Sequence, residues 1–332
     1  MRAALQFSSR CLPIALFVIL QSGCSIVASK IPYILNEEKQ LSIAIDEYNS
    51  KHYKNAIEKL SAILSAHPRT LRALEYRALS FRQLHEYKKA LNDLNQALLL
   101  DPESAYIYGM RGRTYSDLND NEKAILDFTK SITLDPSVPW TYYGRASTYC
   151  DQGEIYQALD DCAKMLEIDR KDAAAYELRA LCNFKLFKKR ACIEDCDKAI
   201  SLDPALINAY GLRGNANADL GFYEAAINDF TIGIAKSNAY PPFYLHRANV
   251  YRKLNLYSKA VADETALISK RYDLASSYAK RGYDYLQMKK YEHALADFNE
   301  ALALDPKCHS AKVNREIALF WLAHSKDKNK LE

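Results

Sequence analysis

Arginine and aspartate recur along this sequence with one constant period, and both side chains can take part in ionic chemistry. Each aspartate follows an arginine at a fixed separation, as Asp93 follows Arg77. The arginines are Arg77, Arg111, Arg145, Arg179, Arg213, Arg247 and Arg281, and the aspartates are Asp93, Asp127, Asp161, Asp195, Asp229, Asp263 and Asp297. A row of guanidinium groups could bind anionic groups of a ligand, but the paired occurrence favours a ladder of structural ion pairs. Whether each Asp pairs with the Arg before it or the Arg after it stays open.

The other residues with catalytic potential do not form a recognisable set. The seven histidines never recur at metal-ligand spacing. The sequence also contains no phosphate-binding Gly-rich loop, no Ser/His/Asp set and no Cys/His set. It therefore predicts a protein that is not an enzyme, with no catalytic residues, no metal site, no cofactor and no small-molecule substrate.

The same period extends through most of the chain. The tripeptide Leu-Asp-Pro occurs at 100–102, 134–136, 202–204 and 304–306, and these positions differ by multiples of 34. Residues 37–308 therefore divide into eight repeats without insertion or deletion. The repeats are 37–70, 71–104, 105–138, 139–172, 173–206, 207–240, 241–274 and 275–308.

Within each repeat, small and apolar residues follow helical spacing in two blocks. Position 8 is Ala or Gly in every repeat, position 20 is Ala in seven of the eight, and positions 21 and 28 are aliphatic. A Pro at position 32 ends the second block in five repeats, because Pro cannot continue a helix. Each repeat is thus predicted to be an antiparallel helix pair, and neighbouring pairs must stack to bury their apolar stripes. The predicted fold class is all-α.

This pattern resembles the tetratricopeptide repeat, shown well by Tyr278 to Gly282 on a first helix and Ala294 to Phe298 on a second. The resemblance implies a right-handed α-solenoid of eight stacked helix-turn-helix repeats that acts as a protein–protein interaction scaffold. Repeats 4, 6 and 7 lack the Pro at position 32, and repeat 7 has Glu264 at the usually bulky position 24. We therefore expect looser packing around 237–242 and 262–274.

In solenoids of this family the first helices line a concave groove, and the resemblance places positions 2, 5, 9, 12 and 13 on it. The ligand-contacting residues that it implies are Tyr106, Arg113, Trp140, Tyr143, Phe184, Asn208, Asn215, Asn249, Arg252 and Tyr283. Aromatic side chains give rigid contact area, and Asn can pair with the backbone of an extended peptide. Trp140 is the strongest candidate, because position 2 has no role in the core. No repeat has Lys at position 5, so the chaperone-tail clamp of the family is not expected.

Residues 1–23 differ in kind from the repeats. Arg2 and Arg10 accompany an apolar run at 12–20, which is too short to span a membrane but fits a secretory signal peptide. The residues that end in Cys24 resemble the lipobox of bacterial lipoproteins, which implies lipidation of Cys24 and a tether over 24–36. Leu does not stand at its usual place three residues before Cys24. Ordinary signal-peptidase cleavage or an uncleaved anchor is therefore the alternative.

A lipidated Cys24 that is not followed by Asp implies an outer-membrane lipoprotein facing the periplasm of a Gram-negative bacterium. The protein would act there as a membrane-tethered adaptor. The alternative is a cytosolic or host-directed interaction module with an uncleaved N-terminus. The eight cysteines motivate this alternative, because an exported chain that starts at Cys24 would keep six further thiols. Of these, Cys162, Cys192 and Cys196 fall in core columns, and Cys150 falls on the presumed groove face.

The C-terminal end and the charge balance complete the prediction. Residues 309–325 repeat the spacing of a first helix and are predicted to be a cap helix, followed by a polar tail at 326–332. Lys and Arg number 45 against 41 Asp and Glu, and removal of Arg2 and Arg10 lowers the excess from four to two. Such a balance does not indicate a nucleic-acid partner.

Overall fold

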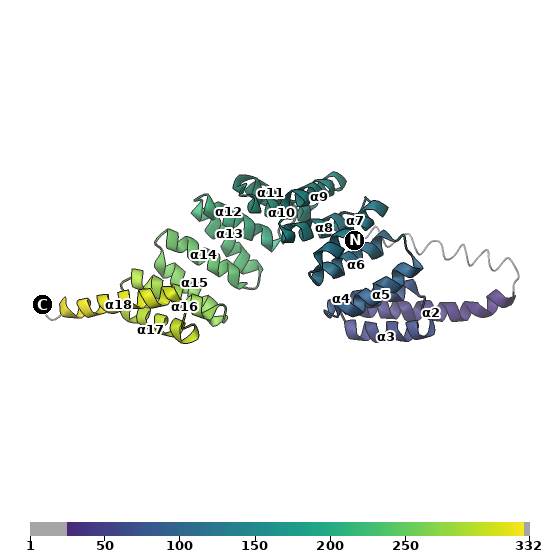
Figure 1. Ribbon diagram of the computed structural model, residues 1–332, viewed down its shortest axis with the longest axis horizontal. Helices are drawn as coiled ribbons and strands as arrows, with labels where there is room; N and C mark the ends of the chain where they lie inside the picture. Colours follow the sequence, from purple (N-terminus) through teal and green to yellow (C-terminus); the bar gives the residue numbers. More distant parts are fainter. Residues whose placement is uncertain (1–24, 329–332) are drawn as a thin grey trace. The chain divides into compact units, whose positions relative to one another are not determined.

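The computed structural model describes the backbone of residues 25–328 and the side chains of residues 36–324. This part of the chain forms seventeen α-helices and no β-strand, and consecutive helices pack in pairs (Figure 1). The predicted all-α fold of stacked helix pairs is thereby confirmed. The chain divides into two compact units, Met1–Gly144 (unit 1) and Arg145–Glu332 (unit 2). No described helix has both the length and the apolar character that are needed to cross a membrane.

Unit 1 contains the first three repeats and the start of the fourth. Its helices are α2 (Ser25–Asn49), α3 (Tyr53–Ala66), α4 (Leu71–Gln83), α5 (Tyr87–Leu100), α6 (Ala105–Asp117), α7 (Asn121–Leu134) and the beginning of α8 (Pro139–Gln152). Helix α2 begins at Ser25, twelve residues before the predicted start of the first repeat. Residues 25–36, assigned to a tether from the sequence, are therefore helical and continuous with the first helix of repeat 1. Cys24 lies outside the described residues.

Unit 2 contains the rest of α8 and the remaining repeats. Its further helices are α9 (Ile155–Ile168), α10 (Ala173–Lys185), α11 (Lys189–Leu202), α12 (Ile207–Asp219), α13 (Tyr223–Lys236), α14 (Pro241–Lys253), α15 (Tyr257–Ser269), α16 (Leu274–Gln287), α17 (Tyr291–Leu304) and α18 (His309–Lys328). Helix α18 occupies the predicted cap, packs against α16 and α17, and continues into the predicted polar tail.

The turn between the two helices of each repeat has the same left-handed residue at position 15. In all eight repeats φ lies between 57° and 82° at this position: Lys51, His85, Asn119, Gly153, Phe187, Gly221, Asn255 and Lys289. Gly and Asn adopt this conformation readily, whereas other residues carry a cost of about 1 kcal/mol. The packing of the helix pair therefore fixes this turn conformation, and different residue types adopt it at position 15.

Packing between the two helices of a repeat couples position 8 to position 24. Position 8 is Gly only in the three repeats with Phe at position 24, and these rings are almost completely buried. The pairs are Gly112–Phe128, Gly214–Phe230 and Gly282–Phe298. A Cβ atom added to these glycines would lie 3.1, 2.6 and 2.8 Å from the facing ring. The small residue and the large residue therefore fill one space together.

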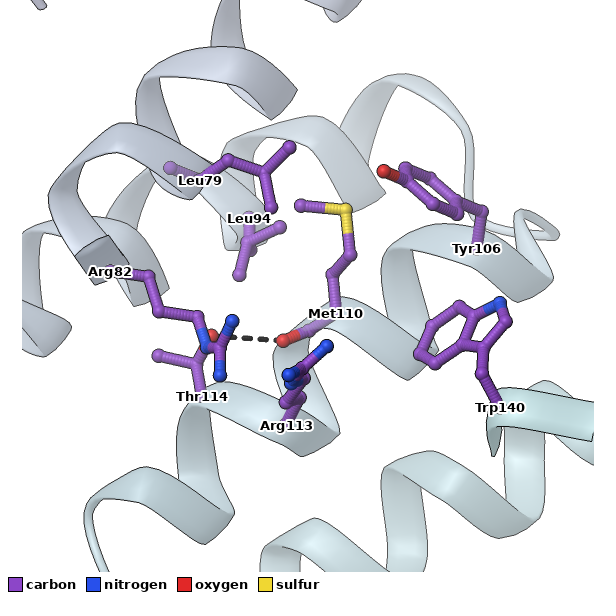
Figure 2. A pocket seen from close by; sticks show the side chains of 9 residues that line it. Leu79, Arg82, Leu94, Tyr106, Met110, Arg113, Thr114 and Trp140 are labelled. Carbon is purple, nitrogen blue, oxygen red and sulfur yellow. Dashed lines mark hydrogen bonds between the residues drawn. The ribbon is translucent and has the colours of Figure 1, made fainter. Parts of the chain in front are cut away.

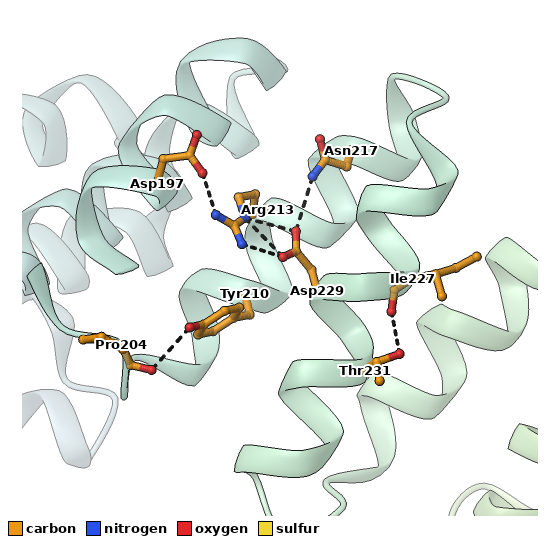
Figure 3. Close-up of polar contacts among 8 residues, drawn as sticks. All are labelled: Asp197, Pro204, Tyr210, Arg213, Asn217, Ile227, Asp229 and Thr231. Atoms are coloured by element: carbon orange, nitrogen blue, oxygen red, sulfur yellow. Dashed lines mark hydrogen bonds and ion pairs between the residues drawn. The ribbon is translucent and has the colours of Figure 1, made fainter. Parts of the chain in front are cut away.

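The Arg–Asp pairs form within repeats. Each of the seven arginines contacts the Asp of the second helix in its own repeat, with a shortest N···O distance of 2.5–2.8 Å. Arg213 shows the full arrangement: two nitrogens face the buried Asp229, and the third donates to Asp197 of the preceding repeat at 2.6 Å (Figure 3). Equivalent bonds to position 25 of the preceding repeat are made by Arg77, Arg111, Arg247 and Arg281. The ladder thus holds each repeat together and also joins neighbouring repeats.

Arg179 differs from these arginines. Position 25 of the preceding repeat is Ala163, whose side chain has no hydrogen-bond acceptor. The Arg179 side chain is 34% exposed, whereas the other six ladder arginines are 16–21% exposed. Among the described residues, the junction between repeats 4 and 5 therefore lacks this link of the ladder.

Repeats 6 and 7 end without Pro at position 32, and their junctions contain left-handed residues. Asn238 and Ala239 precede α14, and Arg271 and Asp273 precede α16, all with positive φ. The looser packing expected at 262–274 is not found on α15, where Glu264 is 0% exposed. A buried arginine partner, described below, contacts one oxygen of Glu264, whereas the other oxygen has no hydrogen-bond partner among the described residues.

Candidate functional site

A pocket of about 110 Å³ lies in unit 1 against the first helices of repeats 2, 3 and 4 (Figure 2). Its lining residues are Ala78, Leu79, Arg82, Leu94, Tyr106, Met110, Arg113, Thr114 and Trp140. Tyr106, Arg113 and Trp140 are three of the residues that the sequence placed in the groove. The structure brings them together around one cavity, and the guanidinium group of Arg82 also lines it.

Trp140 and Tyr106 form a fixed aromatic wall of this pocket. A Cβ atom at Gly109 would lie 2.3 Å from Cη2 of Trp140, so the absence of a side chain lets the indole lie against α6. The Tyr106 ring meets the indole nearly edge-on, with ring centroids 6.1 Å apart at 78°. Edge-to-face contacts of this kind are favourable, because the positive edge of one ring faces the negative face of the other. Gly109, which the sequence analysis did not single out, therefore positions the main candidate residue.

The two arginines of the pocket differ in their partners. Nε of Arg82 is 2.5 Å from a carboxylate oxygen of Asp117. Arg113 forms no ion pair with any residue that the structure describes. Burial, followed by the nearby Arg82, lowers the pKa of Arg113, although a guanidinium stays protonated at neutral pH. Arg113 is thus a partly desolvated cation that a ligand can neutralise.

Glu75 and Tyr106 set the electrostatics at the edge of the pocket. Burial raises the pKa of Glu75 to about 7, and Arg72 opposes this shift. Burial and the proximity of Glu75 raise the pKa of Tyr106 to about 12, so its hydroxyl is neutral and can donate or accept a hydrogen bond. Glu75 occupies position 5 of repeat 2, a position that the resemblance had placed in the groove. Its charge therefore changes close to neutral pH.

The remaining predicted groove residues do not line this pocket. Tyr143 is exposed on α8, in the same helix as Trp140, and interacts electrostatically with Arg113. In unit 2, Phe184 lies beneath the Lys189 ammonium, which is 3.5 Å from the ring centroid. Asn215 is half-buried, whereas Asn208 and Tyr283 are exposed. Oδ1 of Asn249 accepts a hydrogen bond from Arg252 at 2.8 Å.

Arg252 corrects one of the site predictions. Its guanidinium lies between two carboxylates that are both 0% exposed, Glu264 and Asp284. It donates to the two oxygens of Asp284 at 2.8 and 3.0 Å and also contacts Glu264. Burial raises the pKa of both carboxyl groups, against the opposing effect of Arg252. The guanidinium is therefore engaged in the core of unit 2 and is not displayed to a ligand.

Family models for the tetratricopeptide repeat match residues 41–105, 105–138, 173–206 and 275–308, which together make up half of the chain. The chain belongs to the tetratricopeptide-repeat (TPR) family. The last three of these ranges coincide with repeats 3, 5 and 8 as they were delimited from the sequence. No curated protein matches the chain.

Solved structures of other TPR-like chains share this fold. The Cut9–Hcn1 hetero-tetramer has a chain with a TM-score of 0.60 and 20% identity, over 80% of this chain and 52% of that chain. This TPR protein therefore spans about half the length of that relative. PilW, a type IV pilus biogenesis factor, gives a TM-score of 0.57 at 19% identity, over 61% of this chain and 94% of that chain. Pseudomonas aeruginosa pilF gives a TM-score of 0.54 at 14% identity, over 59% of this chain and 90% of that chain.

These similarities show the solenoid fold alone, because the identities are low. TPR repeats indicate protein partners, and the chain is accordingly a protein–protein interaction scaffold. Among the described residues, no group of three or more His, Cys, Asp or Glu is arranged to hold a metal ion.

Proposed function

We propose that this TPR protein is a non-enzymatic adaptor that binds a peptide or protein segment at the pocket of unit 1. The observation that carries the proposal is Arg113, a guanidinium without an ion-pair partner among the described residues, beside the aromatic wall of Tyr106 and Trp140. The pocket is large enough for one side chain, and apolar pockets with a few convergent polar groups are typical ligand sites.

The geometry suggests how a segment would be held. A large apolar side chain would enter the cavity and contact Met110 and the face of Trp140, where aromatic contacts contribute strongly to binding. A carbonyl or carboxylate oxygen of the same segment would accept hydrogen bonds from Arg113. The exposed Tyr143 on α8 would extend the contact area beyond the pocket.

Binding can be tested with peptides selected from a random display library against the full-length chain. Trp140→Ala and Arg113→Ala should each weaken binding of the selected peptides at least about tenfold, as measured by calorimetry. Leu126→Ala is the matched control, because Leu126 is 68% exposed on α7 of the same repeat as Arg113 but does not line the pocket. Equal affinity for all three variants, or selection of no peptide, would reject the pocket as the binding site.

We further propose that the adaptor is an outer-membrane lipoprotein tethered in the periplasm through Cys24, without nucleic-acid or small-molecule partners. The tether rests on the sequence of residues 1–24, which lie outside the described residues. The absence of nucleic-acid and small-molecule partners rests on the near balance of charge and on the lack of catalytic or phosphate-binding motifs. Expression in a Gram-negative host should give a mature mass that starts at an acylated Cys24, and Cys24→Ser should abolish the acylated species. An unmodified mass that starts at Met1 would instead favour the cytosolic or host-directed module.

A further inference from the structure

Two buried thiols of unit 2 lie in direct contact. The Sγ atoms of Cys150 on α8 and Cys182 on α10 are 3.1 Å apart, although the residues are 32 positions apart in the chain. Both side chains are almost completely buried, and they share an apolar cluster with Ala146, Leu178 and Cys162. A disulfide bond is about 2.05 Å long, so the sulfur atoms need to approach by only about 1 Å. The sequence had placed Cys150 on the groove face, but the structure buries it.

We propose that Cys150 and Cys182 form a disulfide bond when the chain folds in oxidising surroundings. Each thiol loses its proton, one S–S bond forms, and the two electrons reduce an external disulfide, such as oxidised glutathione, to two thiols. The product joins repeat 4 covalently to repeat 5 within unit 2.

The position of this bond complements the ion-pair ladder. Position 25 of repeat 4 is Ala163, so Arg179 of repeat 5 does not make the side-chain hydrogen bond that other ladder arginines make to the preceding repeat. Lys185 donates to the backbone carbonyl of Cys150 at 2.8 Å and is a non-covalent link between the same two helices. A disulfide would add the strongest connection where the ladder is interrupted.

The environment of the thiols indicates when the bond forms. Contact with Cys182, followed by burial, raises the pKa of Cys150. Contact with Cys150 lowers the pKa of Cys182, but contact with Cys162 and burial outweigh it and raise the value to about 12. Thiol–disulfide exchange requires a thiolate and access to the oxidant. The bond is therefore acquired during folding, before the two sulfur atoms are buried, and the folded dithiol protein resists oxidation.

Other cysteines of unit 2 provide the competing pairs. Cys162 touches the same cluster, whereas Cys192 and Cys196 lie one turn apart on α11 in a separate cluster. Trypsin alone leaves Cys150 and Cys162 in one peptide, 146–164, because no Lys or Arg lies between them. A second cleavage after Glu154 separates them and makes the linkage assignable.

The experiment is to refold the full-length chain in a glutathione redox buffer, block remaining thiols by alkylation, and map linkages after both cleavages. Peptide 146–154 should be joined to peptide 180–185, which contains Cys182. The oxidised protein should unfold at a temperature about 5–10 °C higher than the reduced protein. Treatment of the folded, reduced chain with the same buffer should give the bond far more slowly.

Variants separate this pair from its neighbours. Cys150→Ala and Cys182→Ala should each abolish both the linkage and the thermal shift, whereas Cys162→Ala should keep both. The proposal is overturned if Cys150 and Cys182 are both alkylated after oxidative refolding. It is equally overturned if either one is linked to Cys162 or another cysteine as often as to its proposed partner.

Discussion

Arg113 in unit 1 and Arg252 in unit 2 were both predicted to face the groove, but their surroundings are opposite. Arg252 contacts two completely buried carboxylates, and Arg113 has no ion-pair partner among the described residues. Arg213 of the ladder lies between these extremes, with one buried and one exposed carboxylate. The number of buried carboxylates around an arginine thus separates a structural role from a role in binding.

The comparison also shows how unit 1 keeps one arginine available. Asp117 stands beside the pocket and pairs with Arg82, and burial raises the pKa of the second nearby carboxyl group, Glu75, to about 7. In unit 2, two acidic residues stand in core positions beside a single arginine and occupy it fully. Arg113 remains available for a ligand because the Asp117 carboxylate is paired with Arg82, and no carboxylate among the described residues forms an ion pair with Arg113.

The largest effect is expected for Arg252→Ala. The substitution leaves Glu264 and Asp284 buried without a cation, and it should lower the free energy of unfolding by about 5 kcal/mol. Urea unfolding followed by circular dichroism measures this loss, and hydrogen exchange should place it in α14–α16. Lys253→Ala, at the neighbouring residue, is the control. A loss below about 1 kcal/mol would remove the distinction between Arg252 and Arg113.

Arg213→Ala should lower the free energy of unfolding by about 3 kcal/mol, which is an intermediate effect. The Asp229 side chain is 3% exposed and would keep only the Asn217 amide as a partner. The same unfolding measurement applies. Asp197→Ala removes the other partner of Arg213 and should cost less than about 1 kcal/mol, since Asp197 is 57% exposed. Equal losses in the two variants would mean that burial does not control the contribution of the ladder.

Glu264→Gln tests the charge of the buried carboxylates through pH. Burial raises the pKa of Glu264 in the folded state above 4.5, so its contribution to stability is full below that pH and declines as pH rises. The variant should therefore become progressively more stable relative to the wild type as pH rises above 4.5. Unfolding curves of both proteins from pH 4 to 8 measure the difference. A constant difference across this range would show that Glu264 does not titrate there.

The smallest effect on stability is expected for Arg113→Ala. No buried carboxylate loses a partner, so the free energy of unfolding should change by less than about 0.5 kcal/mol. The variant therefore stays folded in the peptide-binding experiment, and its lost affinity reports on the site. A loss as large as about 2 kcal/mol, which surface substitutions rarely cause, would show that Arg113 is structural and would place it with Arg252.

Much of the fold could be predicted because the same residue pattern occurs in every repeat. Position 8, position 20 and the Pro at position 32 indicate the two helices and their close approach in one repeat after another. Residues 25–36 were missed because they follow no repeat column, although they continue α2. The burial of Arg252 had a signal, since Glu264 and Asp284 are acids at positions 24 and 10, where neighbouring repeats have apolar or small residues.

The sequence by itself determined the period, the helix pairs and the pairing partners available to each ladder arginine, because these depend on spacing along one or two helices. Only the tertiary structure decided which groove residues are free. Trp140 depends on Gly109, Arg82 on Asp117 and Arg252 on Asp284, and each partner lies about one repeat away in the chain. The physical reason is that a side chain's charge and exposure are set by the neighbouring repeat that packs against it, and column patterns within one repeat do not contain that information.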